Sequence, residues 1–164
     1  MKKIKSAIKN LFIFALLFGV ISFAIDYWRR PNAPENALHQ TLVALNGEKF
    51  QLAELSHEKP ILLYFWGSWC HICQFTSPSI ASLANDGVQV ISVALKSGDN
   101  QVVQDYLRQH KYDFLTVNDP QGELSAQWQI QVTPSIIIIK NGKIVHTTTG
   151  LSSPWGLKLR LWLS

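Results

Sequence analysis

The sequence contains little sulfur: of its 164 residues, two are cysteine and one is methionine. Small domains stapled by disulfides are rich in cysteine, and a bridge between cysteines with only two residues between them would restrict little of the unfolded chain. A composition with 47% hydrophobic residues allows an ordinary core. The cysteines are therefore not needed as a staple. The lack of a methionine-rich or histidine-rich tract also argues against a protein built mainly to capture copper.

The excess of basic over acidic residues is confined to the first thirty residues. This segment carries six Lys or Arg residues and only Asp26 as an acid, whereas the rest of the chain carries nine basic and ten acidic residues. A nearly neutral domain without a basic stripe or an RNA-binding aromatic motif has no footprint for a polyanion. We therefore expect no nucleic-acid partner.

An uncharged apolar run, LFIFALLFGVISFAI, follows four lysines near the N-terminus. A helix over residues 10–28 would be about 28 Å long, with Tyr27 and Trp28 at the membrane interface. The sequence predicts a transmembrane signal anchor here, with residues 1–9 in the cytoplasm. Ser22 and Ala24 also fit a cleaved signal peptide, so cleavage stays open. In both cases everything after residue 30 is exported.

Residues 29–40 are polar, contain two prolines and predict a linker, so we expect the folded domain at 41–164. Asn46-Gly47 and Asn141-Gly142 indicate hairpins with two-residue turns. Asp99 and Ser153 are placed to begin helices. The hydrophobic pattern predicts strands over 61–66, 88–95, 114–117, 135–139 and 143–149, and helices over 71–85, 100–110, 123–128 and 154–163. The expected fold is α/β, a mixed sheet with helices on both faces.

Both cysteines fall where the predicted strand 61–66 gives way to the helix that begins at His71. At a helix N-terminus, free N–H groups and the helix dipole favour an anion such as the Cys70 thiolate. Bringing a thiol from a pKa near 8.5 to below ambient pH takes about 2 kcal/mol, of which the dipole supplies about 0.3 to 1. Hydrogen bonds from N–H groups, and a positive charge on His71, would supply the rest. Cys73 lies one turn further and away from solvent. We therefore expect Cys70 to attack and Cys73 to resolve the mixed disulfide.

The tryptophans are expected to have different roles. Trp66 falls within a buried strand, so we interpret it as core, and Trp69 directly precedes the nucleophile at the surface. Trp128, Trp155 and Trp162 are interpreted as packing residues.

The motif FWGSWCHIC, with VTPSIIII about sixty residues later, resembles the thioredoxin-like proteins from about Leu42 to the C-terminus. With an apolar segment before such a domain, the chain is similar to the membrane-tethered TlpA and ResA type thiol-disulfide oxidoreductases of bacterial envelopes. The segments VALKSGDN, FLTVNDPQGELSAQW and WGLKLRLWL further resemble the suppressor-of-copper-sensitivity protein D group. The resemblance implies a thioredoxin fold, in which Thr133-Pro134 forms the cis-proline loop facing the cysteines. Trp69, His71 and Ile72 then complete the surroundings of the active site.

Two departures from the pattern of the family concern the chemistry. Thioredoxins have a buried acid at the position of Tyr64, and many tethered relatives have a glutamate at the position of Thr76. The proton acceptor for Cys73 is then left open between Glu58, Asp86 and a water molecule. In addition, His71-Ile72 replaces the common Gly-Pro or Glu-Pro dipeptide. A positive charge on His71 would stabilise the Cys70 thiolate and make the pair more oxidising, whereas a neutral or merely solvated His71 would not.

These observations predict a protein-disulfide oxidoreductase, expected to act as a reductase, in the bacterial inner membrane with a single span and its C-terminal domain in the periplasm. It would use the redox-active disulfide Cys70–Cys73 without a cofactor or metal. Its partners would be protein substrates and a transmembrane electron donor, and the resemblance suggests a link to copper tolerance. The alternatives are a Cu(I)-binding protein that uses the cysteines and His71, a disulfide-forming oxidase, and a non-enzymatic scaffold.

Overall fold

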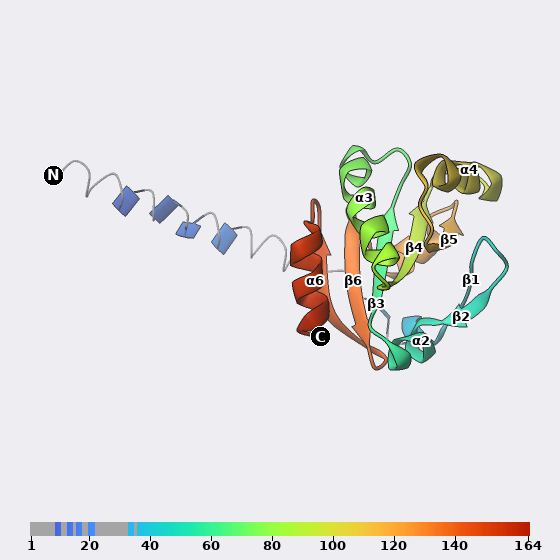
Figure 1. Ribbon diagram of the computed structural model, residues 1–164, viewed down its shortest axis with the longest axis horizontal. Coiled ribbons are helices and arrows are strands. Elements are labelled where there is room, and N and C mark those ends of the chain that lie inside the picture. Colours follow the sequence, from blue (N-terminus) through green and yellow to red (C-terminus); the bar gives the residue numbers. More distant parts are fainter. Residues whose placement is uncertain (1–8, 11–12, 15, 18–19, 22–32, 35) are drawn as a thin grey trace. The chain divides into compact units, whose positions relative to one another are not determined.

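The computed structural model describes residues 9–10, 13–14, 16–17, 20–21, 33–34 and 36–164 (Figure 1). Met1–Arg30 and Pro31–Ser164 are two separate units. None of the helices in these described stretches is both long and apolar enough to cross a bilayer. The predicted cytoplasmic segment 1–9 and the predicted anchor 10–28 lie mostly outside the described residues.

A five-stranded mixed sheet forms the centre of the second unit, in the order β5-β4-β3-β6-β7 (Figure 1). β3 pairs in parallel with β4, and β4 in parallel with β5, whereas the pairs β3–β6 and β6–β7 are antiparallel. The strands are β3 (Ile61–Trp66), β4 (Gln89–Leu95), β5 (Leu115–Asp119), β6 (Ser135–Lys140) and β7 (Lys143–Thr149). The five predicted strands are confirmed to within about two residues at each end.

The central strand β3 is buried on both faces, which explains its continuous apolar run. Ile61, Leu63 and Phe65 belong to one hydrophobic cluster, and the alternate residues of the strand belong to the other. The cluster on the second face also contains both cysteines. The disulfide therefore lies at the end of the best-buried strand.

Helices cover both faces of the sheet, as predicted. The cluster with the cysteines packs under α3 (His71–Asn85), α4 (Asn100–His110) and α6 (Pro154–Trp162), and α3 contacts α6 (Figure 1). The other face carries the short helices η1 (Ala37–His39), α2 (Leu52–Glu58) and α5 (Glu123–Gln127) and the hairpin β1 (Thr41–Val43)–β2 (Lys49–Gln51). Hence α3 and α6 lie side by side on this face of the sheet.

Most helix boundaries agree with the sequence prediction. α3 has the expected bounds and runs through Pro78, while the side chains of Asp99 and Ser153 cap α4 and α6. Two features differ. Helix α2 was not predicted, because it begins directly after β2 with no capping side chain at Gln51. Residues 37–39 of the predicted linker form η1, where Leu38 is buried in the core.

The two Asn-Gly pairs form different turns. Asn141 and Gly142 both have positive φ and join β6 to β7 in a two-residue turn, as predicted. The other hairpin closes through the hydrogen bond from the Ala44 N–H to the Glu48 carbonyl, so its loop has three residues and not two. Here the Leu45 N–H donates to the carbonyl of Thr116 on β5 (2.8 Å), which removes it from the hairpin ladder.

The tryptophan predictions are partly wrong. Trp66 and Trp128 are buried as expected, but Trp155 and Trp162 are each 80% exposed. The two exposed residues are seven positions apart and therefore share one face of α6, while Leu157 packs into the core from the opposite face.

Candidate active site

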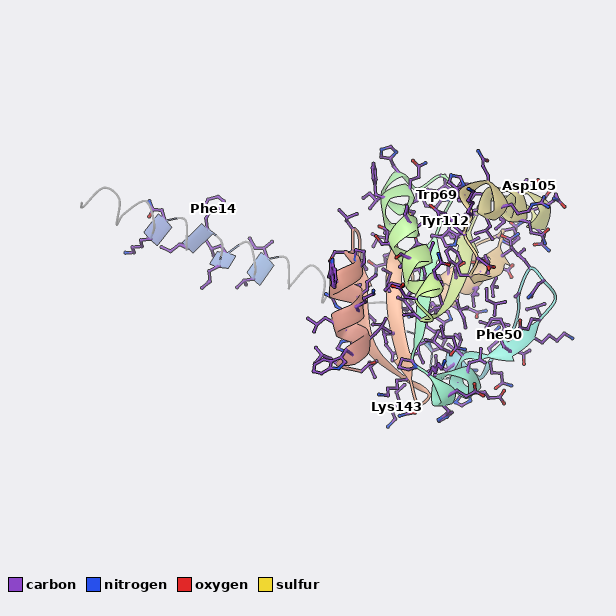
Figure 2. All side chains as sticks on the ribbon, in the orientation of Figure 1. Phe14, Phe50, Trp69, Asp105, Tyr112 and Lys143 are labelled. Carbon is purple, nitrogen blue, oxygen red and sulfur yellow. A yellow bond between two sulfur atoms is a disulfide. The ribbon has the colours of Figure 1, made fainter. Side chains whose placement is uncertain are left out.

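The two cysteines lie where β3 passes into α3, at the end of the domain marked by Trp69 (Figure 2). Cys70 is the N-cap residue of α3, and its sulfur accepts a hydrogen bond from the backbone N–H of Cys73 at 3.2 Å. The two residues form a disulfide, with Cα atoms 5.2 Å apart. A helix N-terminus thus presents its first free N–H group to the sulfur of Cys70.

The surroundings of the two sulfur atoms differ. Cys73 is 1% exposed and belongs to the core, whereas Cys70 is 6% exposed and faces the loop before β6. The Thr133 carbonyl oxygen lies 3.5 Å from Cys70 Sγ, and the Thr133–Pro134 peptide bond is cis. The structure therefore brings Thr133 and Pro134 to the cysteines, as the sequence resemblance implied.

The loop that carries Cys70 is held by the loop after β4. The Ser68 N–H donates to the Ser97 hydroxyl (2.9 Å), and the Trp69 indole N–H donates to the Leu95 carbonyl (3.0 Å). Ser97 was not singled out from the sequence. The available signal was its place just after a buried strand parallel to β3, since the carboxyl ends of parallel strands meet at one edge of the sheet.

An apolar rim surrounds the disulfide. Trp69, Ile72 and Phe75 are exposed by 58%, 47% and 65%, although large apolar side chains are usually covered. The exposed His71 stacks edge-on against Phe75, with ring centres 5.5 Å apart. Phe75 was missed in the sequence, where an aromatic residue one turn after His71 was the only signal.

A pair of buried hydroxyl groups lies between β3 and α3. The hydroxyls of Tyr64 and Ser77 are 2.9 Å apart, and Ser77 lies four residues after Cys73, on the same face of the helix. Thr76 is also fully buried and donates to the Ile72 carbonyl. Burial raises the pKa of the Tyr64 phenol far above its ordinary value, against the opposing effect of its hydrogen bond with Ser77. The phenol is therefore neutral at physiological pH.

The two acids considered as proton acceptors lie at the wrong end of the domain. Asp86 is the C-cap residue of α3, about 20 Å along the helix from Cys73, and it pairs with Lys158. Glu58 ends α2 and precedes β3, whereas the cysteines follow the other end of that strand. Neither carboxylate can accept a proton directly from Cys73, so of the three candidates only a water molecule is left.

Outside the masked positions, no group of three or more His, Cys, Asp and Glu side chains is arranged to hold a metal ion. What the site contains is a sulfur at a helix N-terminus, a more deeply buried partner sulfur and exposed apolar side chains on the neighbouring residues. Such an arrangement supports exchange between dithiol and disulfide.

Fold and site together define a thioredoxin-like thiol-disulfide oxidoreductase. More particularly, the chain belongs to the AhpC/TSA family, whose model matches residues 32–147. It is 51% identical over 162 residues to a thioredoxin-like protein of Haemophilus influenzae, covering 99% of this chain and 97% of the relative. It is 28% identical to the sporulation thiol-disulfide oxidoreductase A of Bacillus subtilis, covering 85% and 88% of the two chains. The structure of dsbF from MTB superposes with a TM-score of 0.68 at 23% identity, over 80% of this chain and 98% of dsbF, which supports the fold.

Proposed function

We propose that this chain is a protein-disulfide reductase, anchored by residues 10–28 in the bacterial inner membrane, with the domain in the periplasm. The observation that carries the proposal is the asymmetry of the two sulfurs: Cys70 caps α3 beside the Thr133 carbonyl and is 6% exposed, whereas Cys73 lies deeper in the core and is 1% exposed. That asymmetry suits a first cysteine that meets the client and a second that meets only the first.

In the first step, the Cys70 thiolate of the reduced enzyme attacks one sulfur of a client disulfide. The S–S bond of the client breaks, a mixed disulfide forms at Cys70, and the second client sulfur leaves as a thiolate that takes up a proton. The Cys73 N–H at the start of α3 stabilises the attacking thiolate, because it donates to Cys70 Sγ.

In the second step, Cys73 loses its proton and attacks Cys70 Sγ. The client leaves as a dithiol, and the enzyme is left with the Cys70–Cys73 disulfide, so two electrons have passed to the client. The Tyr64 and Ser77 hydroxyls take the place of a buried carboxylate in this step. They are neutral and are hydrogen-bonded to each other, and water accepts the proton of Cys73. A transmembrane electron donor then reduces the disulfide again.

The surface beside the disulfide favours a protein client. An extended client segment can pair with the main chain at Thr133, like an added strand, so that it is recognised by its backbone. Trp69, Ile72 and Phe75, which are exposed and next to the cysteines in the sequence, offer an apolar contact. This combination suits clients that share a disulfide but not a sequence.

The anchor and the copper link rest on the sequence. Residues 1–9 supply the positive charges that keep a signal anchor's N-terminus in the cytoplasm. The Haemophilus relative matches 99% of the chain, and so includes this segment. The resemblance to the suppressor-of-copper-sensitivity protein D group extends the proposal to copper tolerance, with envelope proteins as the clients.

The reduction potential of the Cys70–Cys73 pair tests the direction of electron flow. Equilibration of the protein with glutathione buffers should give a value closer to that of thioredoxin, about −270 mV, than to that of DsbA, about −120 mV. A value near the latter would make the protein a disulfide-forming oxidase and contradict the proposal.

A further inference from the structure

Helix α6 is apolar on two opposite faces. Leu157 is fully buried and Leu161 packs against the cluster that contains the cysteines. On the other face Trp155 and Trp162 are each 80% exposed, and Leu159 and Leu163 are 56% and 60% exposed. The face made by Trp155, Leu159, Trp162 and Leu163 is called the α6 outer face below. The match to the AhpC/TSA family model ends at residue 147, before α6 begins.

The spacing of the α6 outer face is that of one continuous stripe. Its members follow Trp155 at intervals of four, seven and eight residues, so they lie within one side of the helix. Just before the helix, Leu151 is a further apolar side chain with 72% exposure. Two tryptophans on one exposed stripe are unusual for a free surface, and tryptophan is the residue that favours a boundary between water and hydrocarbon.

Acidic and basic residues of the domain are separated along the sequence. The last acidic residue of the chain is Glu123. β6, β7 and α6 follow it in the sequence, and all of their charged side chains are basic. By contrast, residues 31–123 carry ten acidic and five basic side chains. The basic side chains after Glu123 are Lys140, Lys143, Lys158 and Arg160. Lys158 Nζ lies 5.8 Å from the centre of the Trp155 ring while it pairs with Asp86.

A groove of about 320 Å³ beside Trp162 adds to this surface. It lies between α6 and the segments that enter β3 and β4, and its lining includes Lys59, Val88, Lys158 and Leu161. An apolar floor with two lysines among the lining residues matches acyl chains and anionic headgroups. The groove, the α6 outer face and the absence of acidic residues after Glu123 all favour an anionic lipid surface as the partner.

We propose that the α6 outer face binds an anionic bilayer surface, with Trp155 and Trp162 in the headgroup region and α6 parallel to the membrane. The binding belongs to the domain itself, although its use in the cell rests on the proposed anchor. A linker from residue 29 to η1 spans at most about 30 Å. It would hold the domain so close to the bilayer that even a weak surface interaction is populated.

This orientation has a consequence for the disulfide. The Gly150 N–H donates to the Pro134 carbonyl (2.8 Å), which ties the chain entering α6 to the loop beside Cys70. The Trp155 end of α6 is therefore the end nearer the active site. An α6 that lies on the membrane keeps the disulfide close to the bilayer surface, within reach of a membrane-embedded electron donor.

The test uses residues 31–164, which contain both hydrophobic clusters and both sheets and therefore have their own core. Vesicles of phosphatidylcholine alone, and vesicles with phosphatidylglycerol added, are sedimented with the oxidised domain. The domain should bind the anionic vesicles and show a blue shift of its tryptophan emission. The double variant Trp155→Ser/Trp162→Ser should bind about tenfold less. Val102→Ser removes an apolar side chain of 51% exposure from α4 and should bind as the parent does.

Arg160→Gln should weaken binding to the anionic vesicles and leave the weak binding to neutral vesicles unchanged. Failure of the parent domain to bind anionic vesicles, or equal binding by the double variant, overturns the proposal. Concentration-dependent dimerisation that the double variant abolishes, without vesicle binding, would assign the face to a second copy. The double variant should still reduce a soluble protein disulfide at the parent rate. Loss of reductase activity in the parent domain itself would contradict the proposed function and leave the membrane face standing.

Discussion

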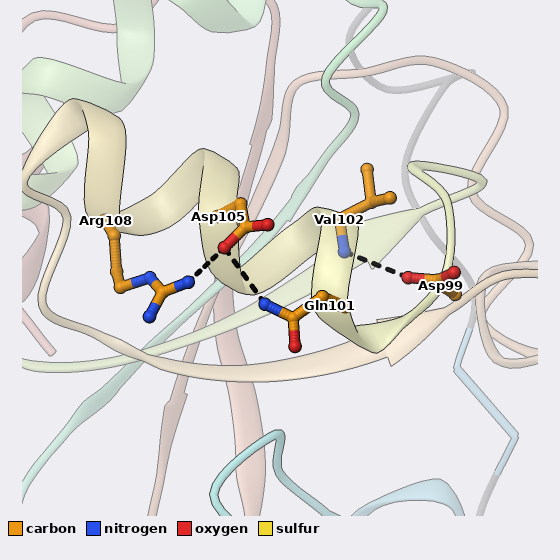
Figure 3. A network of polar contacts seen from close by, with 5 residues as sticks. All are labelled: Asp99, Gln101, Val102, Asp105 and Arg108. Carbon is orange, nitrogen blue, oxygen red and sulfur yellow. Dashed lines mark hydrogen bonds and ion pairs between the residues drawn. The ribbon is translucent and has the colours of Figure 1, made fainter.

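Two helices of this domain, α3 and α4, begin with the same geometry and different chemistry. At α4 the Asp99 carboxylate accepts the N–H of Val102 at 2.9 Å (Figure 3). At α3 the sulfur of Cys70 accepts the N–H of Cys73 at 3.2 Å. Each cap lies three residues before its donor, which is the usual N-cap arrangement. The first cap only stabilises a helix, whereas the second can change its charge.

The difference shows how a structural position becomes a reactive one. A carboxylate cap takes no part in thiol chemistry, so the start of α4 is the same in every redox state. The Cys70 cap carries a negative charge in the reduced enzyme as a thiolate and loses it when the disulfide forms. We therefore expect the N-terminus of α3 to stabilise the dithiol form of the enzyme over the disulfide form. The Asp99 cap of α4, which has no redox chemistry, is the reference for this effect.

Exchanging the reactive cap has the largest expected effect. Cys70→Ser keeps a capping oxygen but removes the nucleophile, so turnover of protein disulfides should fall to background while α3 stays folded. Cys73→Ser should instead accumulate a mixed disulfide through Cys70, visible on a non-reducing gel. Equal trapping by the two variants would show that the cysteines do not have separate roles.

The Tyr64–Ser77 hydroxyl pair is a second difference between the two helices. Among the described contacts, no such pair lies beneath the start of α4. Tyr64→Phe leaves the Ser77 hydroxyl without its partner and should lower the free energy of unfolding of the oxidised protein by about 1 to 3 kcal/mol near pH 8. Urea denaturation measures this loss. Ser56→Ala removes another buried hydroxyl, far from the cysteines, and serves as a control for destabilisation alone.

The same variant predicts a pH dependence. The folded state raises the pKa of Tyr64, so its contribution is complete below the unfolded value near 10 and is lost as the pH rises above it. The parent should therefore lose stability between about pH 10 and 12 more steeply than Tyr64→Phe. Parallel curves for the two proteins would mean that the phenol does not titrate with unfolding.

The carboxylate cap should behave as a purely structural group. Asp99→Ala removes the acceptor for Val102 and should cost about 1 kcal/mol of stability. The reduction potential of the Cys70–Cys73 pair should stay unchanged, and equilibration with glutathione measures both parent and variant. A shifted potential would show that the α4 cap reaches the active site through the loop at Ser97.

His71 should have a small effect that appears only in the redox chemistry. If it carries a positive charge beside Cys70, His71→Ala should make the pair more reducing by about 10 to 20 mV. Gln74→Ala, another exposed residue of α3, is the control and should leave the potential unchanged. An unchanged potential in both variants would leave His71 as a solvated neighbour of Phe75.

The smallest effect is expected on the exposed side of α4. Asp105 accepts hydrogen bonds from Arg108 and Gln101 (Figure 3), and the Arg108 guanidinium lowers the pKa of this carboxyl. Because this network is on the surface, Arg108→Ala should change the midpoint of urea unfolding by no more than the error of the measurement. A clear loss of stability would mean that the network of Gln101, Asp105 and Arg108 contributes to the free energy of unfolding despite its exposure.

The sequence predicted the fold well where one local rule decides the outcome. The apolar run of β3, the caps Asp99 and Ser153 and the turn at Asn141-Gly142 all depend on neighbouring residues, and the structure has them as expected. The hairpin at Asn46-Gly47 was wrong in its turn, since Leu45 pairs with a strand some seventy residues away. Contacts of that range leave no local pattern.

The site was predictable in its cysteines and less so in its surroundings. A Cys-x-x-Cys pair at a strand-to-helix junction is visible in the sequence, and the resemblance supplied Thr133 and Pro134. The support from Ser97, the exposure of Phe75 and the pairing of Tyr64 with Ser77 depend on how distant segments pack. The same limit explains Trp155 and Trp162, because the sequence cannot show which of two apolar faces of a helix meets the core.

The most direct test of the asymmetry between the cysteines is the titration of each thiol alone. In reduced Cys73→Ser and Cys70→Ser proteins, thiolate absorbance in the far ultraviolet reports the remaining cysteine. The account predicts that Cys70, at the start of α3, titrates below the ordinary value of about 8.5 and that Cys73, buried beneath it, titrates above it. A Cys70 thiol that titrates at or above the ordinary value, or above Cys73, would contradict the central claim.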